Sequence, residues 1–344
     1  MGYTAGIMNN VRKLWEKCNI AREFPRLAER VRFDEPMTLH TTFRVGGPAD
    51  LYAEPDSVEE LTALLSFFHE ESVPVWITGG GSNLVISDHG LRGACVSLAA
   101  FRSISLLDPV ISRSDTLVSA GAGLPVDELV SWCAERGLSG LEQFAGLPGT
   151  VGGAVYMNAR CYDRSVSDVF FRAEVLVFHE GRYTVEVVDR KEEDWGYKKS
   201  PFQDCDPKPD RGTPPVVLSA VFSVVPADQK TIRDVMDRCV RDREEKGHFR
   251  YPSAGSMFKN NRAFGKSSGQ IIDEAGLRGF TVGGAQVAPW HGNLVINRGT
   301  ASAEDIRRLV EQVRTAVYEK TGFLLETEVV FAGEWQRAEK DENL

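Results

Sequence analysis

Apolar and polar residues over positions 51–83 follow the spacing of a strand, a helix and a second strand. Five apolar residues between the two apolar runs recur three and four positions apart, as on one face of a helix: Val58, Leu61, Leu64, Leu65 and Phe68. Asp56 and Glu59 have the spacing of a capping box at its start. Three glycines follow the second run. The pattern predicts a βαβ opening that ends in a glycine turn.

The middle of the chain predicts a helix and then antiparallel strands. A capped helix is expected after Pro125, with four residues on one apolar face: Val126, Leu129, Val130 and Cys133. Apolar residues alternate from 170 to 188 and turn at Glu180–Gly181, which predicts a hairpin. A proline-rich, charged surface loop over 201–215 and a strand from 216 to 225 follow.

The last third predicts a separate unit. A charged helix over 228–247 leads into it, and a later helix starts at Ser302, with core spacing at Ile306, Leu309, Val310, Val313 and Val317. A strand is expected from Leu324 to Phe331, before a polar tail that is not expected to be ordered. The predicted parts are an N-terminal extension with a short amphipathic helix (1–32), two halves of one domain (33–100 and 101–226), a further domain (227–335) and the tail (336–344).

Composition and charge narrow the classes of function. A chain of 344 residues exceeds what one core usually organises. The net charge of -9 and the lack of basic runs with interleaved aromatics argue against a nucleic-acid surface. The six cysteines have no C-x-x-C spacing, which favours reduced thiols and no metal site. No apolar run has the length of a signal peptide or a membrane span, so a cytoplasmic protein without a membrane partner is expected.

Two glycine-rich loops are the first candidate binding site. Gly79, Gly80 and Gly81 follow an apolar strand, where backbone amides can approach a pyrophosphate closely. Such clusters are also common as tight turns, and this one does not match G-x-G-x-x-G. The second loop, AGLPGTVGGA, lies about seventy residues later. Two such loops in one domain favour a long ligand held at two points, as a dinucleotide would be.

Eight segments in this order carry a resemblance to a known family: TLHTTFRVGGPADLYAEP (38–55), GGGSNLVISDHG, GLPGTVGGAVYMNA, GYKKSPF, PSAGSMFKNN, GQIIDEAGLRG, HGNLVIN and LLETEVVF (324–331). Together they resemble the UDP-N-acetylenolpyruvoylglucosamine reductases of cell-wall synthesis. The resemblance spans about residues 33–333.

This resemblance implies an α+β fold, with a two-part FAD-binding unit of the vanillyl-alcohol-oxidase type and a C-terminal α+β substrate domain. It implies that NADPH reduces FAD and that UDP-N-acetylglucosamine enolpyruvate is then reduced to UDP-N-acetylmuramate, a peptidoglycan precursor. A monomer is expected. The residues implied to bind FAD are Gly79, Gly80, Gly81, Ser82, Asn83, Leu84, Pro148, Gly149, Thr150 and Gly153.

The resemblance also implies catalytic roles. Ser256 matches the family's proton donor and Glu328 its catalytic carboxylate. On strand alternation Leu324, Glu326, Glu328 and Val330 share one face, so apolar neighbours are expected beside Glu328. Lys198 stands where the family has an arginine, which keeps the charge but not the planar fork. Our hypothesis is that Arg160, which stands where the family usually has glycine, supplies the missing guanidinium.

Substrate contacts are implied at Tyr162, Arg160, Lys259, Asn260 and Asn293. The interval of 58 positions from Lys198 to Ser256 is short for the subclass with a tyrosine-bearing lid, so the lidless subclass is expected. Two other functions stay open: a flavin-dependent oxidase of a hydroxylated substrate, and a flavin-binding protein without catalysis. Ser256, Lys259 and Asn260 together argue against the first alternative, and the departures at 198 and 160 favour the second.

Overall fold

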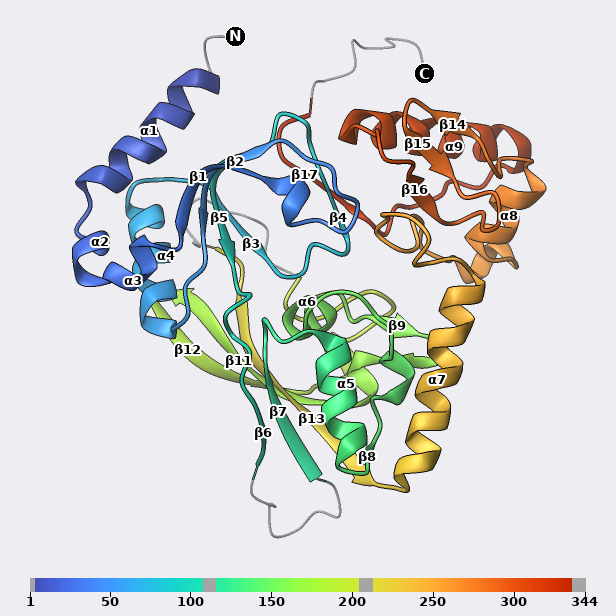
Figure 1. Ribbon diagram of the computed structural model, residues 1–344, viewed down its shortest axis with the longest axis horizontal. Helices are drawn as coiled ribbons and strands as arrows, with labels where there is room; N and C mark the ends of the chain where they lie inside the picture. The colour runs from blue at the N-terminus through green and yellow to red at the C-terminus, as the bar shows by residue number, and fades with distance from the viewer. Residues whose placement is uncertain (1–3, 108–115, 204–212, 336–344) are drawn as a thin grey trace.

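The computed structural model describes residues 4–107, 116–203 and 213–335 (Figure 1). In Figure 1 the N-terminal elements and the C-terminal elements lie side by side at the top, above a lower part built around a six-stranded sheet. The expected polar tail, residues 336–344, lies outside the described residues. Within the described parts, none of the helices combines the length and apolarity that crossing a bilayer requires.

The predicted βαβ opening is confirmed. Strands β2, β5 and β3 are parallel neighbours, and β1 pairs antiparallel with β2. Helix α4 buries four of the five predicted residues fully, and Val58 partly. The elements are α1 (Thr4–Lys17), α2 (Ile20–Glu23), α3 (Pro25–Ala28), β1 (Val31–Pro36), β2 (Pro48–Ala53), α4 (Val58–Glu70), β3 (Val75–Thr78), β4 (Leu84–Ile86) and β5 (Leu91–Ser97).

The predicted cap of α4 is wrong by one residue. Ser57, not Asp56, is the N-cap, and its hydroxyl accepts the Glu60 N–H at 3.2 Å. The carboxylate of Glu60 in turn accepts the Asp56 N–H at 2.9 Å and binds Arg30. Glu60 serves because its side chain is buried beside Arg30, whereas Glu59 is exposed on the outer face of the helix.

The lower part contains the predicted hairpin of β11 and β12, in a sheet of order β12-β11-β13-β7-β6. Glu180 and Gly181 both have positive φ, as a two-residue hairpin turn requires. Helix α5 buries all four predicted residues but has no side-chain cap at Pro125. The elements are β6 (Ile104–Leu106), β7 (Thr116–Gly121), α5 (Val126–Glu135), β8 (Leu138–Ser139), α6 (Val151–Tyr156), β9 (Arg160–Cys161), β10 (Arg164–Ser165), β11 (Phe170–His179), β12 (Arg182–Asp189) and β13 (Val216–Pro226).

Helix α7 (Gln229–Glu245) connects the lower part to the C-terminal part (Figure 1). It confirms the charged helix, and it starts just after β13 ends at Pro226, the predicted boundary. The last long helix starts after Ser302 as expected, and its five core residues are buried. The remaining elements are α8 (Ser268–Glu274), β14 (Thr281–Val282), β15 (Ala285–Val287), β16 (Val295–Asn297), α9 (Ala303–Thr321) and β17 (Val330–Ala332).

The strand predicted from Leu324 to Phe331 is wrong in extent and in phase. Within this segment only β17 is a strand. It pairs in parallel with β4, which belongs to the first part of the fold, the part that contains β1 to β5. Leu325 and Val329 are buried, whereas Leu324 is 62% and Val330 43% exposed. The alternation is therefore offset by one residue, because the C-terminal core takes the odd-numbered side chains. Glu328 lies on the opposite side from that core.

Candidate active site

The first glycine loop, residues 79–83, connects β3 to β4 and packs closely on other backbone. Gly81 has a φ of +61°, and a Cβ there would lie 2.0 Å from the carbonyl oxygen of His40. No other residue type fits this contact without a backbone shift. The loop is therefore seated directly on the segment that contains His40.

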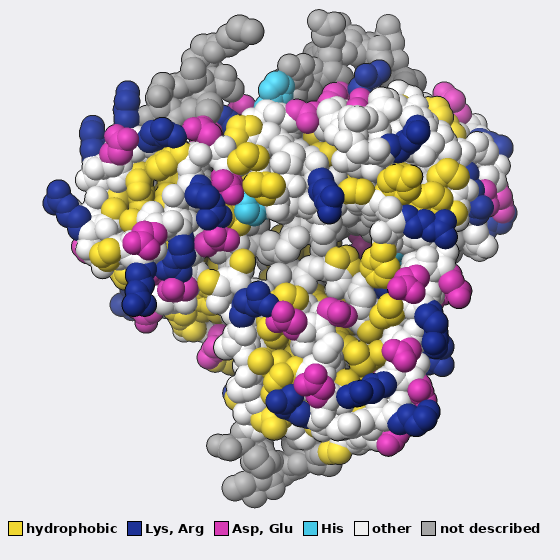
Figure 2. Space-filling model, in the orientation of Figure 1, with side chains coloured by type: hydrophobic (Ala, Val, Ile, Leu, Met, Phe, Trp, Pro, Cys, Tyr) yellow, Lys and Arg dark blue, Asp and Glu magenta, His cyan; other side chains and the backbone are white. Residues whose placement is uncertain are grey.

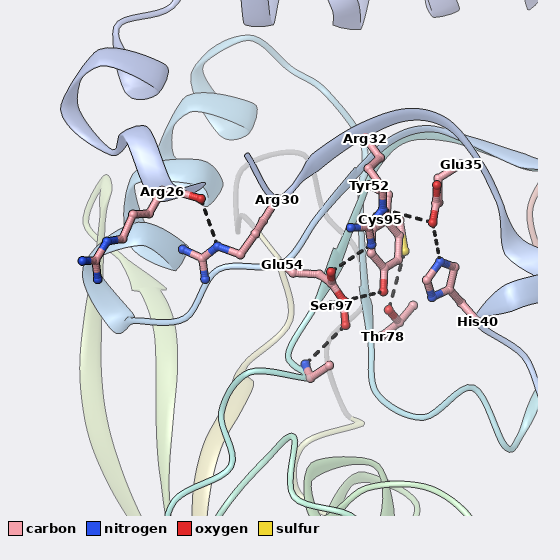
Figure 3. Close-up of polar contacts among 11 residues, drawn as sticks. Arg26, Arg30, Arg32, Glu35, His40, Tyr52, Glu54, Thr78, Cys95 and Ser97 are labelled. Atoms are coloured by element: carbon pink, nitrogen blue, oxygen red, sulfur yellow. Dashed lines mark hydrogen bonds and ion pairs between the residues drawn. The ribbon is translucent and has the colours of Figure 1, made fainter. Parts of the chain in front are cut away.

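A partly buried polar network holds that segment in the first sheet (Figure 3). The guanidinium of Arg32 contacts Glu35 at 3.0 Å and Glu54 at 2.8 Å, and His40 shares a hydrogen bond of 2.8 Å with Glu35. The ring of Tyr52 stacks on His40 with 4.2 Å between centroids. Burial raises the pKa of the Tyr52 hydroxyl. Each side chain of this network is restrained by a hydrogen bond, an ion pair or a ring contact with another member.

The second glycine loop contacts the first, although the two are about seventy residues apart in the chain. A Cβ at Gly79 would lie 2.4 Å from Thr150 Oγ1, and one at Gly80 would lie 2.8 Å from the Cα of Gly149. A Cβ at Gly149 would lie 2.5 Å from Ser82 Oγ. Side chains at these positions would push the loops apart, so the glycines allow the approach.

Thr150 carries an unused hydroxyl at this junction. Its side chain is buried, and Oγ1 has no hydrogen-bond partner among the described residues. As N-cap of α6 it also makes no side-chain capping bond. A buried hydroxyl without a partner is costly, which indicates that a polar ligand completes the site. Together with the two glycine loops, it forms a cradle that suits a pyrophosphate.

Ser256 and Glu328 are brought together by the backbone. The Glu328 N–H donates to the carbonyl of Met257 at 2.8 Å, and Phe258 forms a bridge with Thr327. Ser256 is half-buried, and its hydroxyl has no hydrogen-bond partner within the described part of the chain. Thr42 Oγ1 donates to the carbonyl of Ser253 at 2.7 Å. This bond anchors the serine loop, residues 252–258, to the first part of the fold.

The carboxylate of Glu328 is held by Lys198. Lys198 Nζ lies 2.5 Å from Glu328 Oε1, and the two side chains are only 11% and 14% exposed. The apolar environment expected for Glu328 is thus wrong, because the side chain faces a cation rather than the core. Lys198 has a φ of +57° in a turn where Gly196 and Lys199 bond each other, and Asn158 donates to the Gly196 carbonyl at 2.8 Å.

Arg160 and Tyr162 make contacts other than this ion pair. Arg160 is exposed, and its Nη1 donates to Ser165 Oγ at 3.1 Å. The hydroxyl of Tyr162 donates to Asp242 Oδ2 at 2.9 Å on α7. The geometry favours Lys198 over Arg160 as the cation at Glu328, while substrate contacts at Arg160 and Tyr162 stay predictions.

The sequence analysis missed Arg243, a half-buried cation at the second glycine loop. Its Nη2 donates to Cys161 Sγ at 3.0 Å, and Nε has no hydrogen-bond partner among the described residues. A Cβ at Gly146 would lie 3.1 Å from its Cδ. Its guanidinium also lies 6.0 Å from the centroid of the Tyr162 ring. Its place in a charged helix hid this role, since most such arginines are solvated.

Among the predicted substrate contacts, Asn293 bonds the protein itself. Its amide accepts from the Phe258 N–H at 2.9 Å and donates to the Phe258 carbonyl at 2.8 Å, so it supports the serine loop. Lys259 Nζ pairs with Glu326, and Asn260 Oδ1 accepts the Ser268 N–H at 2.8 Å. Direct contact of these three residues with a substrate stays a prediction.

The face drawn in Figure 2 is hollowed where the upper and lower parts meet. On this face acidic and basic side chains are interspersed rather than gathered by sign. Over the described ranges, no three His, Cys, Asp or Glu side chains converge as metal ligands would. Five cysteines in those ranges are free thiols.

Comparison with known proteins decides the family. The C-terminal domain model of UDP-N-acetylenolpyruvoylglucosamine reductase matches residues 247–332, and an FAD binding domain model matches 49–185. The reductase of Treponema denticola is 45% identical over 89% of this chain and 94% of its own length. This chain belongs to the UDP-N-acetylenolpyruvoylglucosamine reductase family.

Two further relatives extend the match. The reductase of Treponema pallidum is 43% identical over 88% of this chain and 94% of its own length. The solved structure of the Thermus caldophilus reductase has a TM-score of 0.67 and 31% identity, over 88% of this chain and 97% of that one. The family models confirm the expected FAD-binding unit and C-terminal reductase domain, and the described helices and strands confirm the mixed α+β content.

Proposed function

We propose that this chain reduces UDP-N-acetylglucosamine enolpyruvate to UDP-N-acetylmuramate with NADPH, through FAD, in peptidoglycan precursor synthesis. The observation that carries this proposal is the convergence of Ser256, Glu328 and Lys198 beside the first glycine loop. Family membership supplies the reaction, and the convergence of these groups supports their proposed catalytic roles.

The residues at the two loops fit FAD. The cradle between them is narrow enough to exclude a Cβ at Gly79, Gly80 and Gly149, and the Thr150 hydroxyl there lacks a partner. These features suit the pyrophosphate of a dinucleotide. When bound, FAD supplies the hydride that NADPH provides. Arg243 lies beside the second loop and would add a cation to the bound cofactor or substrate.

The chain's own residues deliver the proton. A hydride goes to the terminal enolpyruvyl carbon and a proton to the neighbouring carbon, so the double bond is saturated as NADPH becomes NADP⁺. Ser256 is the proton donor, and its hydroxyl makes no hydrogen bond to any residue that the structure describes. Glu328 and Lys198 face the developing negative charge, and the ammonium of Lys198 stabilises it electrostatically. Their low exposure strengthens this effect because water screens them little.

We further propose that the protein acts in the cytoplasm, as a monomer of the lidless subclass. Free thiols at the five described cysteines support a reducing compartment. In the interval from Lys198 to Ser256, the described regular elements include β13 and α7. Size-exclusion chromatography with light scattering tests the monomer.

An anaerobic titration tests the reaction. NADPH should bleach the flavin absorbance of the purified protein, and UDP-N-acetylglucosamine enolpyruvate should restore it. A protein that is yellow but does not respond to the enolpyruvate would support the non-catalytic alternative. Bleaching by a hydroxylated substrate, with NADPH ineffective, would support the oxidase.

A further inference from the structure

Asn83 is the last residue of the first glycine loop, and it bonds the segment that carries Glu328. Its side-chain Nδ2 donates to the carbonyl of Glu328 at 3.0 Å. Its own carbonyl accepts the Val330 N–H at 3.0 Å. The parallel pairing of β17 with β4 begins at the next position, where Val330 is opposite Leu84. Asn83 therefore contacts this segment through both its backbone and its side chain.

Glu328 is consequently held by three different segments. The Met257 carbonyl binds its N–H at 2.8 Å, the Asn83 amide binds its carbonyl, and Lys198 binds its carboxylate at 2.5 Å. Met257 belongs to the serine loop and Asn83 to the first glycine loop. Among the described residues, the Asn83 contact is the one that connects the backbone of Glu328 directly to the cofactor cradle.

We infer that Asn83 is a positioning residue that sets Glu328 relative to the cofactor cradle, so that proton delivery is aligned with hydride delivery. This inference rests on the proposed function. It assigns the Asn83 amide a task beyond the cofactor contact expected from the sequence, since Nδ2 is committed to Glu328. A carboxylate out of place by about 1 Å can cost roughly 100-fold in rate.

The reaction has two halves, reduction of the flavin by NADPH and reduction of the enolpyruvyl group by the flavin. Measuring them separately distinguishes a positioning role from simple cofactor binding. Hydride transfer from NADPH needs neither the proton of Ser256 nor the Glu328–Lys198 pair, whereas saturation of the enolpyruvyl group needs both. Loss of the Asn83 amide should therefore slow the second half selectively. A residue that only retained FAD would change cofactor affinity without selecting between the halves.

The test uses Asn83→Ala and Asn83→Asp with saturating FAD in the buffer, in anaerobic stopped flow. Bleaching by NADPH should change by less than about threefold, and recovery of absorbance with the enolpyruvate should slow by about 10- to 100-fold. Asn83→Asp is expected to be at least as slow, because its carboxylate repels the Glu328 carbonyl. The matched control is Asn297→Ala, which removes another side-chain amide that donates to a backbone carbonyl, that of Phe43 at 3.0 Å. It should leave the ratio of the two rates unchanged.

Hydrogen exchange gives a readout that is independent of turnover. In the FAD-loaded Asn83→Ala protein, the amides of Glu328 and Val330 should exchange faster than in the wild type, while those in α9 should not. Equal slowing of both half-reactions, or unchanged recovery with unchanged exchange, overturns the inference. If the wild-type flavin does not recover with the enolpyruvate, the proposed function itself fails, which is a different outcome.

Discussion

Single side chains decide the chemistry of the cleft, and Lys198 is the clearest case. It replaces an arginine of the family pattern, yet its ammonium reaches Glu328 at 2.5 Å. An ammonium is a point charge without the planar fork of arginine, so it holds one carboxylate oxygen rather than two. The pair is little exposed, which makes the loss of either partner costly.

Removal of this charge should slow turnover strongly. Lys198→Ala is expected to lower kcat by about 100-fold, because the developing negative charge loses its cation. Lys198→Arg should stay within about tenfold of the wild type, since the charge remains. Steady-state NADPH oxidation with the enolpyruvate measures both variants.

Arg160→Ala is the matched control for a nearby cation. Its guanidinium is exposed and bonds Ser165, so kcat should change by less than about twofold. A large loss in Arg160→Ala, with Lys198→Ala near the wild type, would restore the hypothesis that Arg160 supplies the missing charge.

His248 is a second residue with a measurable effect, this time on stability. Its ring packs against His291 with 5.5 Å between centroids. Burial, followed by His291, Arg243 and Lys246, lowers the pKa of His248 from 6.5 to about 4, while Asp242 opposes the shift. The unfolded chain therefore binds more protons between these values. The free energy of unfolding should fall as the pH drops from about 6.5 towards 4.

His248→Gln should make this pH dependence smaller. The loss of free energy of unfolding between pH 7.5 and 5 should be smaller in this variant than in the wild type by on the order of 1 kcal/mol. The effect is this modest because His248 is only partly buried and water screens its charge. Urea denaturation at the two pH values measures it. His179→Gln, whose side chain is 72% exposed, is the control and should keep the wild-type dependence. An unchanged dependence in His248→Gln would contradict the assignment.

At the level of elements, the contact between the two glycine loops is the critical one. Each loop by itself has the composition of an ordinary turn. The loops pack so closely that no Cβ fits at Gly79, because it would lie 2.4 Å from Thr150 Oγ1. The shape of the cradle thus depends on both loops.

Gly79→Ala should weaken cofactor binding. The added methyl group displaces Thr150 and should raise the Kd for FAD by about tenfold or more, which corresponds to about 1.4 kcal/mol. Recovery of free-flavin fluorescence on dilution measures it. Gly269→Ala in α8 serves as control, because its Cβ would meet Asn293 at an ordinary 3.5 Å. An equal Kd for the two variants would show that the cradle tolerates a side chain.

For the whole molecule, the C-terminal part is locked to the first part at several points. Strand β17 pairs with β4, and Phe43, Val45 and Val85 of the first part belong to the C-terminal core. The carboxylate of Asp88 accepts the N–H groups of Ala303 and Glu304 at 2.9 Å each, at the start of α9. The parts are therefore expected to unfold together.

Asp88→Ala tests this coupling. Loss of the cap should lower the free energy of unfolding by about 1 kcal/mol, and Asp88→Asn should lose less because it keeps one acceptor. Flavin release and loss of helical circular dichroism should keep one common midpoint in urea. Two separated midpoints in the wild type would show that the parts unfold independently.

Much of the fold and the choice of residues was predictable from the sequence. Helices α4, α5, α7 and α9 and the hairpin of β11 and β12 have strong periodicity, because each element buries one face. The motifs identified Ser256, Glu328 and the glycine loops. The segment 324–331 was misjudged because a short extended segment has equal alternation in either phase. The core that it packs against decides which phase is buried.

By itself, then, the sequence determined the periodic elements, the family and the identity of the reactive groups, since these depend on local order and residue type. Only the tertiary structure decided what those groups contact: Glu328 with Lys198 instead of apolar neighbours, Asn83 with Glu328, and Arg243 beside the second loop. These contacts join residues that are about 100 to 250 positions apart in the chain. They form only when sheets, loops and helices pack, because burial and charge pairing are properties of the folded chain and not of its local spacing.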